Sequence, residues 1–182
     1  MALRSTVYKA DLSIADIDRG YYADHPLRIA RHPSETEERM MVRLLAFAKF
    51  ASDSLQFAAG LSTIEEPDLW QKDLTGAIEL WVEVGLPDDK RLRRACGRAA
   101  EVAVLAYGGA RADIWWAQSA TALERCDNLS VWRLPPHQSA ELAALADRAM
   151  VLTCSIQDQQ IWIGNGERGV SVEPELLKAA VR

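Results

Sequence analysis

The sequence predicts one domain, residues 1–182, of the mixed α/β (α+β) class, in which helices flank a mixed sheet. Two kinds of segment occur in turn along the chain. In one kind apolar and polar residues alternate, which is typical of strands, and in the other the apolar residues recur every three or four positions, which is typical of helices. No repeat or low-complexity tract interrupts this order. The composition, 49% hydrophobic and 26% charged, is ordinary for a globular domain, and 182 residues suffice for one core.

The element types follow from these periodicities. Alternation from Val7 to Ile14, then turn residues and an extended stretch at 21–32, predicts an N-terminal antiparallel hairpin. A single apolar stripe predicts a helix over 34–52, and the Asn165-Gly166 dipeptide predicts a hairpin near the C-terminus. The other predicted strands span 55–61, 68–73, 77–85, 101–108 and 128–134, with more strands in 150–174, and the other predicted helices span 88–98, 110–123 and 136–149.

Charge and cysteine content limit location and chemistry. No run approaches the roughly 18 apolar residues of a membrane span, and the N-terminus lacks the apolar core of a signal peptide, so we expect a cytoplasmic protein with no membrane partner. Cys96, Cys126 and Cys154 lack the spacing of a zinc site or a disulfide framework and are interpreted as core thiols. A net charge of -5 means that nucleic-acid binding would need a local basic patch.

Two acids stand in the otherwise apolar strand at 77–85. Side chains alternate along a strand, so Glu79, Trp81 and Glu83 are expected on one face. Burying two carboxylates is costly unless a cation or hydrogen bonds compensate them, and a divalent metal would do so. The alternative is that this face is the solvated side of the sheet. Trp81 is the tryptophan placed to touch a substrate.

Two further acids are candidates for the same site. Glu38 stands in the first turn of the helix at 34–52, where it either reaches the edge of the sheet or is a surface acid favoured at a helix start. Asp68 follows Pro67 and either begins a functional strand or initiates a turn. Both the metal-binding and the structural interpretations therefore stay open.

The segments "ARHPSETEERMM", "EEPDLWQKDLTGAIELWVEVGLPDDKRLRRACGRA" and "NLSVW" resemble the YaeQ family, and the similarity runs through essentially the whole chain. This resemblance implies a PD-(D/E)XK restriction-endonuclease-like core of a helix, three strands, a helix and a strand, with the N-terminal hairpin and C-terminal strands added. It also implies Mg²⁺ or Mn²⁺ held by acids on the second and third core strands, assisted by a Glu on the first helix. Asp68, then Glu79 or Glu83, and Glu38 match these positions by type and order.

The sequence departs from that family pattern at the lysine that helps to activate water. Trp81 stands two residues after Glu79, and Gly85 two residues after Glu83. Without a nearby cation the attacking water depends on the metal alone to lower its pKa. Lys72 and Lys90 are the nearest replacements in sequence, and Lys72 is the first choice.

The helix at 88–98 is the candidate basic patch. Lys90, Arg91, Arg94 and Arg98 fall on one side of it, opposite an apolar side. Cations spaced in this way suit a phosphate backbone, although acids at the start and arginines further on are also typical of a solvated helix.

Two functions are consistent with these residues. The first is a Mg-dependent nuclease that hydrolyses phosphodiester bonds in DNA or RNA with a degenerate active site. Its metal ligands are Asp68, Glu79 and Glu83, and Glu38 and Lys72 complete the catalytic set. The alternative is a catalytically inactive nuclease-fold module that binds nucleic acid or a transcription-related partner. No phosphate-binding loop or Ser-His-Asp elbow is present.

Overall fold

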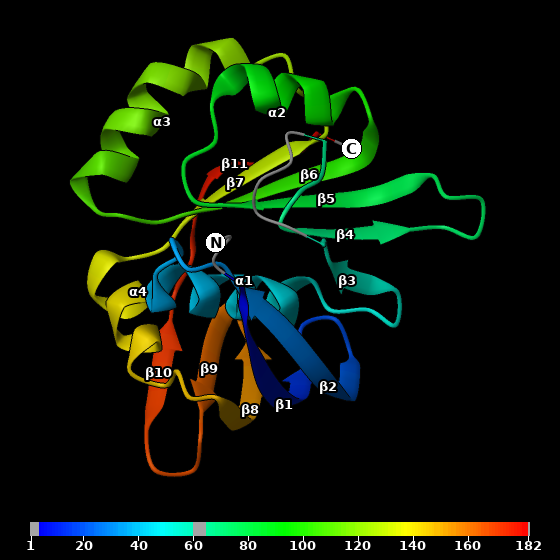
Figure 1. Cartoon of the computed structure of the whole chain (residues 1–182). Helices are drawn as coiled ribbons and strands as arrows, with labels where there is room; N and C mark the ends of the chain where they lie inside the picture. The colour runs from blue at the N-terminus through cyan, green and yellow to red at the C-terminus, as the bar shows by residue number, and fades with distance from the viewer. Residues whose placement is uncertain (1–3, 60–64, 182) are drawn as a thin grey trace.

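The computed structural model describes residues 4–59 and 65–181 and arranges them in four layers. Figure 1 shows α2 and α3 above a six-stranded sheet, then α1 with α4, then a five-stranded sheet. None of the described helices is long and apolar enough to cross a membrane. The helices are α1 (Glu37–Phe50), α2 (Asp89–Cys96), α3 (Ala110–Leu123) and α4 (Pro136–Ala143).

The six-stranded sheet carries the candidate acids. Its strand order is β11-β7-β6-β5-β4-β3, with β5, β6 and β7 parallel and the other pairs antiparallel. The connections through α2 and α3 lie on one face, as right-handed crossovers between parallel strands require. The strands are β3 (Leu55–Phe57), β4 (Leu69–Lys72), β5 (Ile78–Val84), β6 (Ala99–Ala106), β7 (Leu129–Arg133) and β11 (Glu175–Lys178).

The five-stranded sheet covers the other side of α1. Its order is β10-β9-β8-β1-β2, with β1 and β8 parallel and the other pairs antiparallel. Burial alternates along β1, so that one face packs on the core and the other meets solvent. The strands are β1 (Thr6–Asp16), β2 (Tyr21–Arg31), β8 (Ala149–Gln157), β9 (Gln160–Gly164) and β10 (Gly169–Val172).

Helix α1 is the centre of the fold, because it lies between the two sheets. Every residue from Met40 to Ala48 is buried, including Arg43. A helix that is buried on all sides has no solvated face on which to place a charge. Arg43 must therefore find its partners inside the protein.

The predicted α+β class, the N-terminal hairpin and the hairpin at Asn165-Gly166 are confirmed. The prediction of a single mixed sheet is wrong, because the strands form two separate sheets. Each sheet contains a pair of neighbouring strands that are far apart in sequence: β1 with β8 in one, and β7 with β11 in the other. Local periodicity carries no information on such pairs. All three cysteines are free thiols, and two of them, Cys126 and Cys154, are buried.

Some predicted bounds also differ. The helix at 136–149 ends at Ala143, because the chain turns there and enters β8 at Ala149. The strand at 55–61 ends at Phe57, and its residues 60 and 61 lie outside the described residues. Strand β11 lies in a segment for which the sequence predicted no element.

Candidate functional site: buried carboxylates and their arginines

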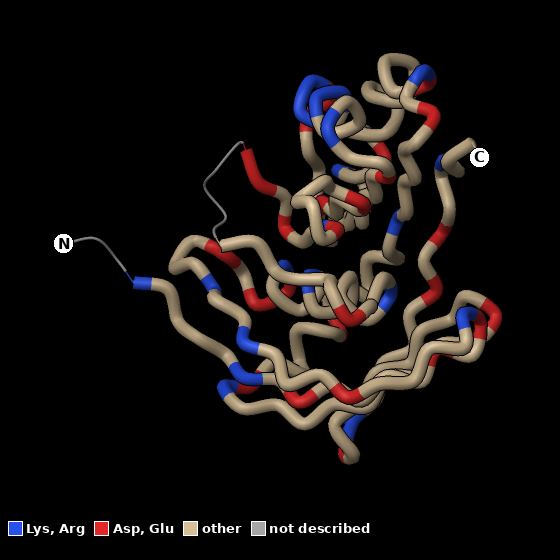
Figure 2. Tube along the Cα trace, turned by 90° about the vertical axis from the view of Figure 1, so that its right-hand side faces the viewer, with Lys and Arg blue, Asp and Glu red and all other residues tan. Residues whose placement is uncertain are grey.

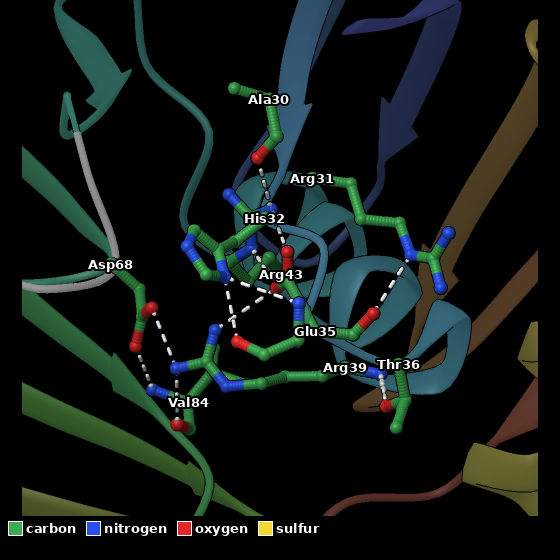
Figure 3. A network of polar contacts seen from close by, with 10 residues as sticks. Ala30, Arg31, His32, Glu35, Thr36, Arg39, Arg43, Asp68 and Val84 are labelled. Atoms are coloured by element: carbon green, nitrogen blue, oxygen red, sulfur yellow. Dashed lines mark hydrogen bonds and ion pairs between the residues drawn. The ribbon is translucent and has the colours of Figure 1, made fainter. Parts of the chain in front are cut away.

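A network of charged side chains occupies the N-terminal end of α1 (Figure 3). Thr36 caps the helix by accepting a hydrogen bond from the Arg39 amide at 3.1 Å, so Glu35 lies just before the first turn. The Glu35 side chain is 0% exposed. Its two oxygens accept from Nε and Nη2 of Arg43, both at 2.8 Å, and Oε1 also accepts from Arg39 at 3.0 Å. Such two-pronged, charge-assisted bonds are among the strongest in proteins.

Arg39 links this network to Asp68, which immediately precedes β4. Its Nη2 donates to Asp68 Oδ1 at 2.8 Å and to the carbonyl oxygen of Val84 at 3.2 Å. The other Asp68 oxygen accepts from the Val84 amide at 2.7 Å. Burial would lower the pKa of Arg39, but the carboxylates of Asp68 and Glu35 outweigh it and raise that pKa. Asp68 thus joins β4, β5 and α1 through bonds that depend on its charge.

Glu83 is a second buried acid, at the C-terminal end of β5. Its Oε1 accepts from the Trp81 indole at 2.8 Å and from Arg91 Nε of α2 at 2.7 Å. Burial raises the pKa of Glu83, and the neighbouring Asp68 charge raises it further, against the opposing bonds from Trp81 and Arg91. Asp68 and Glu83 are therefore electrostatic neighbours.

Glu79 does not join them. The β4–β5 ladder shifts register between Gln71, which faces Leu80, and Lys72, which faces Ile78. Glu79 accepts a hydrogen bond from Gln71 at 2.7 Å and lines a cavity on the α1 side of the sheet. The prediction that Glu79 and Glu83 share a face is wrong, because strict alternation fails where a strand carries a bulge.

Glu38 and Lys72 also lie elsewhere. Glu38 accepts a hydrogen bond at 2.8 Å from Ser139, a fully buried residue of α4, and so ties α1 to α4. Lys72 is exposed at the far end of β4, with its ammonium 3.6 Å from the centroid of the Trp70 ring. Four residues of strand, about 13 Å, separate it from Asp68. Lys72 makes no hydrogen bond or ion pair to Asp68 or Glu83, and its role as a replacement for the missing lysine stays a prediction.

The donor set at this site does not fit a divalent ion. Asp68 and Glu83 each bind a guanidinium group, and a metal would have to displace both arginines. Within residues 4–59 and 65–181, no three acidic, histidine or cysteine side chains are gathered so that they could hold an ion. Mg²⁺ requires near-octahedral oxygen ligands at about 2.1 Å. Here the arginines supply the positive charge that the sequence argument assigned to a metal.

The predicted basic patch divides into two parts. Arg91 turns inward to Glu83 and donates to the Glu66 carbonyl at 2.8 Å. Arg98 lies beyond the end of α2, bonded to Glu65, with its guanidinium 5.2 Å from the centroid of the Trp81 ring. Trp81 is itself 2% exposed, so it is not available to a substrate.

Lys90 and Arg94 form the other part. Both are exposed, and neither side chain forms a hydrogen bond or ion pair with any residue that the structure describes. Figure 2 shows the basic residues of this helix gathered in one coil at the surface. The exposed face of α2, defined here by Lys90 and Arg94, is the available part of the predicted patch.

Sequence reasoning missed the most buried acid, Glu35, and its arginines. A signal was present, because Glu35, Arg39 and Arg43 follow one another at intervals of four residues, which places them on one side of a helix. What hid it was the assumption that residues outside the apolar stripe of α1 meet solvent.

Nearly the whole chain resembles one group of bacterial proteins. The family model described as "YaeQ protein" matches residues 1–174. The chain belongs to the YaeQ family. The YaeQ proteins of Escherichia coli (strain K12) and Salmonella typhi are each 46% identical to it, over 172 and 173 residues, or 94% and 95% of this chain and 95% and 96% of theirs.

Two solved YaeQ structures share its fold. The crystal structure from Xanthomonas axonopodis pv. citri has 46% identity and a TM-score of 0.93, covering 96% of this chain and 99% of that one. The structure from Pseudomonas syringae has 36% identity and a TM-score of 0.91, covering 96% and 97%. The predicted family is therefore confirmed over nearly the full length.

Proposed function

We propose that the protein is a nucleic-acid-binding module with a PD-(D/E)XK nuclease-like core and without hydrolytic activity. The order α1, β3, β4, β5, α2, β6 corresponds to the helix, three strands, helix and strand that such a core contains. The two helices lie on opposite faces of the sheet, and Asp68 and Glu83 stand on its second and third core strands or at their ends.

One observation carries this proposal: both core acids are paired with arginine. A guanidinium never loses its proton near neutral pH and cannot serve as a general base. An entering metal would have to displace a guanidinium group from each acid and compensate for the lost ion pairs. Arg39 and Arg91 come from different helices, and the acids therefore hold both helices on the sheet.

The exposed face of α2 supports the binding half of the proposal. The Glu83–Arg91 pair fixes the helix, while Lys90 and Arg94 extend from it without a protein partner in the described chain. With a net charge of -5, association depends on this local patch. Contacts to two phosphates would be weak, insensitive to base sequence and strongly reduced by salt.

A metal-dependent nuclease is the second candidate. The observation in its favour is that Asp68 and Glu83 are close enough for the charge of one to raise the pKa of the other, in the two positions where a nuclease of this fold keeps acids. The binding module could also take a transcription-related protein as its partner in place of nucleic acid, and that protein would dock on the same exposed face of α2.

Fluorescence anisotropy with labelled single-stranded, duplex and branched DNA and RNA tests the proposal. Replacing Lys90 and Arg94 by Gln should weaken binding about equally across sequences and reduce the salt dependence by up to about two units of slope. A matched control replaces Lys9 and Arg28, an exposed cross-strand pair on the other sheet that also has no ion pair within the described residues.

Binding that falls equally in both double variants would reflect net charge alone and would contradict a docking role for α2. Binding to none of the nucleic acids would leave the protein partner as the occupant of this face. Cleavage of any of them with Mg²⁺ or Mn²⁺, abolished by Glu83→Gln, would replace the proposal with the nuclease candidate.

A further inference from the structure

A cavity of about 440 Å³ opens at the C-terminal end of α1. It lies apart from the acid network, because Arg39 and Lys49 are ten residues apart on α1, or about 15 Å at 1.5 Å per residue. Its walls come from the end of α1 and the two residues after it, from the turn after β1, from β4 and from the N-terminal ends of β5 and β6. Charged and polar residues that line it are Arg19, Lys49, Ser52, Gln71, Glu79 and Glu101.

Lys49 is the unusual member of this set. Its ammonium forms no hydrogen bond or ion pair with the described residues and lies 3.8 Å from the centroid of the Trp132 ring and 5.6 Å from that of Phe50. Burial lowers its pKa to about 8, against the raising effects of Asp16 and Asp18 and with a lowering effect of Arg19. The exposed carboxylates of Glu79 and Glu101 line the same cavity but do not pair with it.

Arg19 provides a fixed cation beside this amine. Its Nε donates to Asp16 at 2.6 Å and its Nη1 to the Ala51 carbonyl at 2.9 Å, so two of its three nitrogens are anchored. Nη2 has no hydrogen bond within residues 4–59 and 65–181. A carboxylate in the cavity would find in Arg19 an orientated guanidinium partner.

We propose that this cavity binds a small carbonyl compound that carries a carboxylate, such as a 2-oxo acid, and that Lys49 forms an imine with it. The neutral amine attacks the carbonyl carbon, a C–N bond forms, and the carbonyl oxygen takes a proton to give a carbinolamine. Loss of that oxygen as water leaves the C=N bond. Addition and dehydration balance without an oxidant or reductant, and Arg19 holds the carboxylate. This site is independent of the proposed nucleic-acid face.

The other lysines provide internal controls. Lys72 stacks on Trp70 at 3.6 Å, nearly the distance of Lys49 from Trp132, but it is exposed and lines no part of this cavity. Lys178 donates to two carbonyl groups at 2.8 and 3.1 Å. At pH 7 a lysine with a pKa near 8 has roughly 300 times the neutral fraction of one near 10.5. Restricted access to the cavity reduces this advantage, and we expect labelling of Lys49 to be at least about tenfold faster.

The experiment traps the imine with cyanoborohydride. The folded protein is incubated with glyoxylate at pH 7, reduced, digested and mapped by mass spectrometry. Lys49 should be modified first, at a rate that rises with pH and levels off above about pH 8, as for a group with that pKa. Acetaldehyde, which has no carboxylate, serves as the second probe.

Arg19→Gln should slow labelling of Lys49 by glyoxylate but not by acetaldehyde. Lys49→Met should abolish this fast phase, whereas Lys72→Met should keep it. Labelling of Lys49 at the same rate as Lys72 in the wild-type protein would overturn the proposal, whether or not any variant folds. Equal labelling by both probes, unaffected by Arg19→Gln, would overturn the carboxylate specificity.

Discussion

The network at the N-terminal end of α1 and the exposed face of α2 are both rich in arginine and lysine, but they satisfy their charges differently. In the network, ion pairs of 2.8–3.0 Å join the buried side chains of Glu35, Arg43 and Asp68 to one another and to the half-buried Arg39. On α2, the Lys90 side chain is exposed and forms no contact with a described carboxylate, so its charge faces solvent. A buried charge must be paired for the protein to fold, whereas an exposed one costs nothing when unpaired and stays available to a partner.

Arg91 connects the two regions. Its guanidinium binds Glu83 beneath the helix, while its backbone amide is capped by Asp88 at 2.7 Å. The buried pair therefore sets where the exposed face of α2 stands on the sheet. Substitutions in the network should change stability, and substitutions on the face should change binding.

The largest effect is expected from Glu35→Gln, because it takes away the negative charge shared by Arg39 and Arg43. Leaving the buried Arg43 and the half-buried Arg39 without it should lower the free energy of unfolding by about 3–5 kcal/mol. Urea denaturation measures this change. Glu37→Gln, an exposed acid in the first turn of the same helix, is the control and should cost less than about 1 kcal/mol. Equal losses in both variants would show that burial of the network contributes nothing.

Lys49 provides a third case for this comparison, because it is half-buried on α1 and no carboxylate is bonded to it. Its folded-state pKa, about 8, lies below the ordinary lysine value of 10.5, so folding disfavours its charged form. Lys49→Met should therefore raise stability at pH 7 by up to about 3 kcal/mol. The unfolded chain binds more protons between pH 8 and 10.5, so the wild type should regain stability over that window and the difference should shrink. A difference that does not change with pH would exclude this cause.

A smaller effect is expected from Glu83→Gln. Burial and Asp68 raise the folded-state pKa of Glu83 above the ordinary glutamate value of 4.5, so charging this group opposes folding. The amide can still accept from Trp81 and Arg91 through its oxygen. As the pH rises from 4.5 toward the higher folded-state pKa, the wild type should lose stability relative to the variant. At pH 7 the variant should equal the wild type in stability or exceed it by up to about 1 kcal/mol. A clear loss at pH 7 would mean that the bond to Arg91 outweighs the burial cost.

The smallest effect on stability, within about 0.5 kcal/mol, is expected from replacing Lys90 and Arg94 by Gln. Thermal melting of the double variant measures it. A large loss would identify these side chains as structural and would remove the contrast between the two regions.

Sequence predicted the element types well because apolar periodicity is local, and it identified Asp68 and Glu83 because buried-looking acids are rare. It could not give the partners of those acids. The choice between a metal and an arginine depends on which helix crosses the end of β5, and that is fixed by packing between distant segments. The misplacement of Glu79 has a different origin, since a single bulge in β5 reverses the face of one residue and leaves no mark in the pattern.

The central claim is that Asp68 and Glu83 hold arginines and not a metal. A crystal structure of the protein soaked in Mn²⁺, with anomalous data, tests it most directly. The account predicts no anomalous peak at these carboxylates and intact ion pairs from Arg39 to Asp68 and from Arg91 to Glu83. A Mn²⁺ ion coordinated by both acids, with the two arginines displaced, would contradict it.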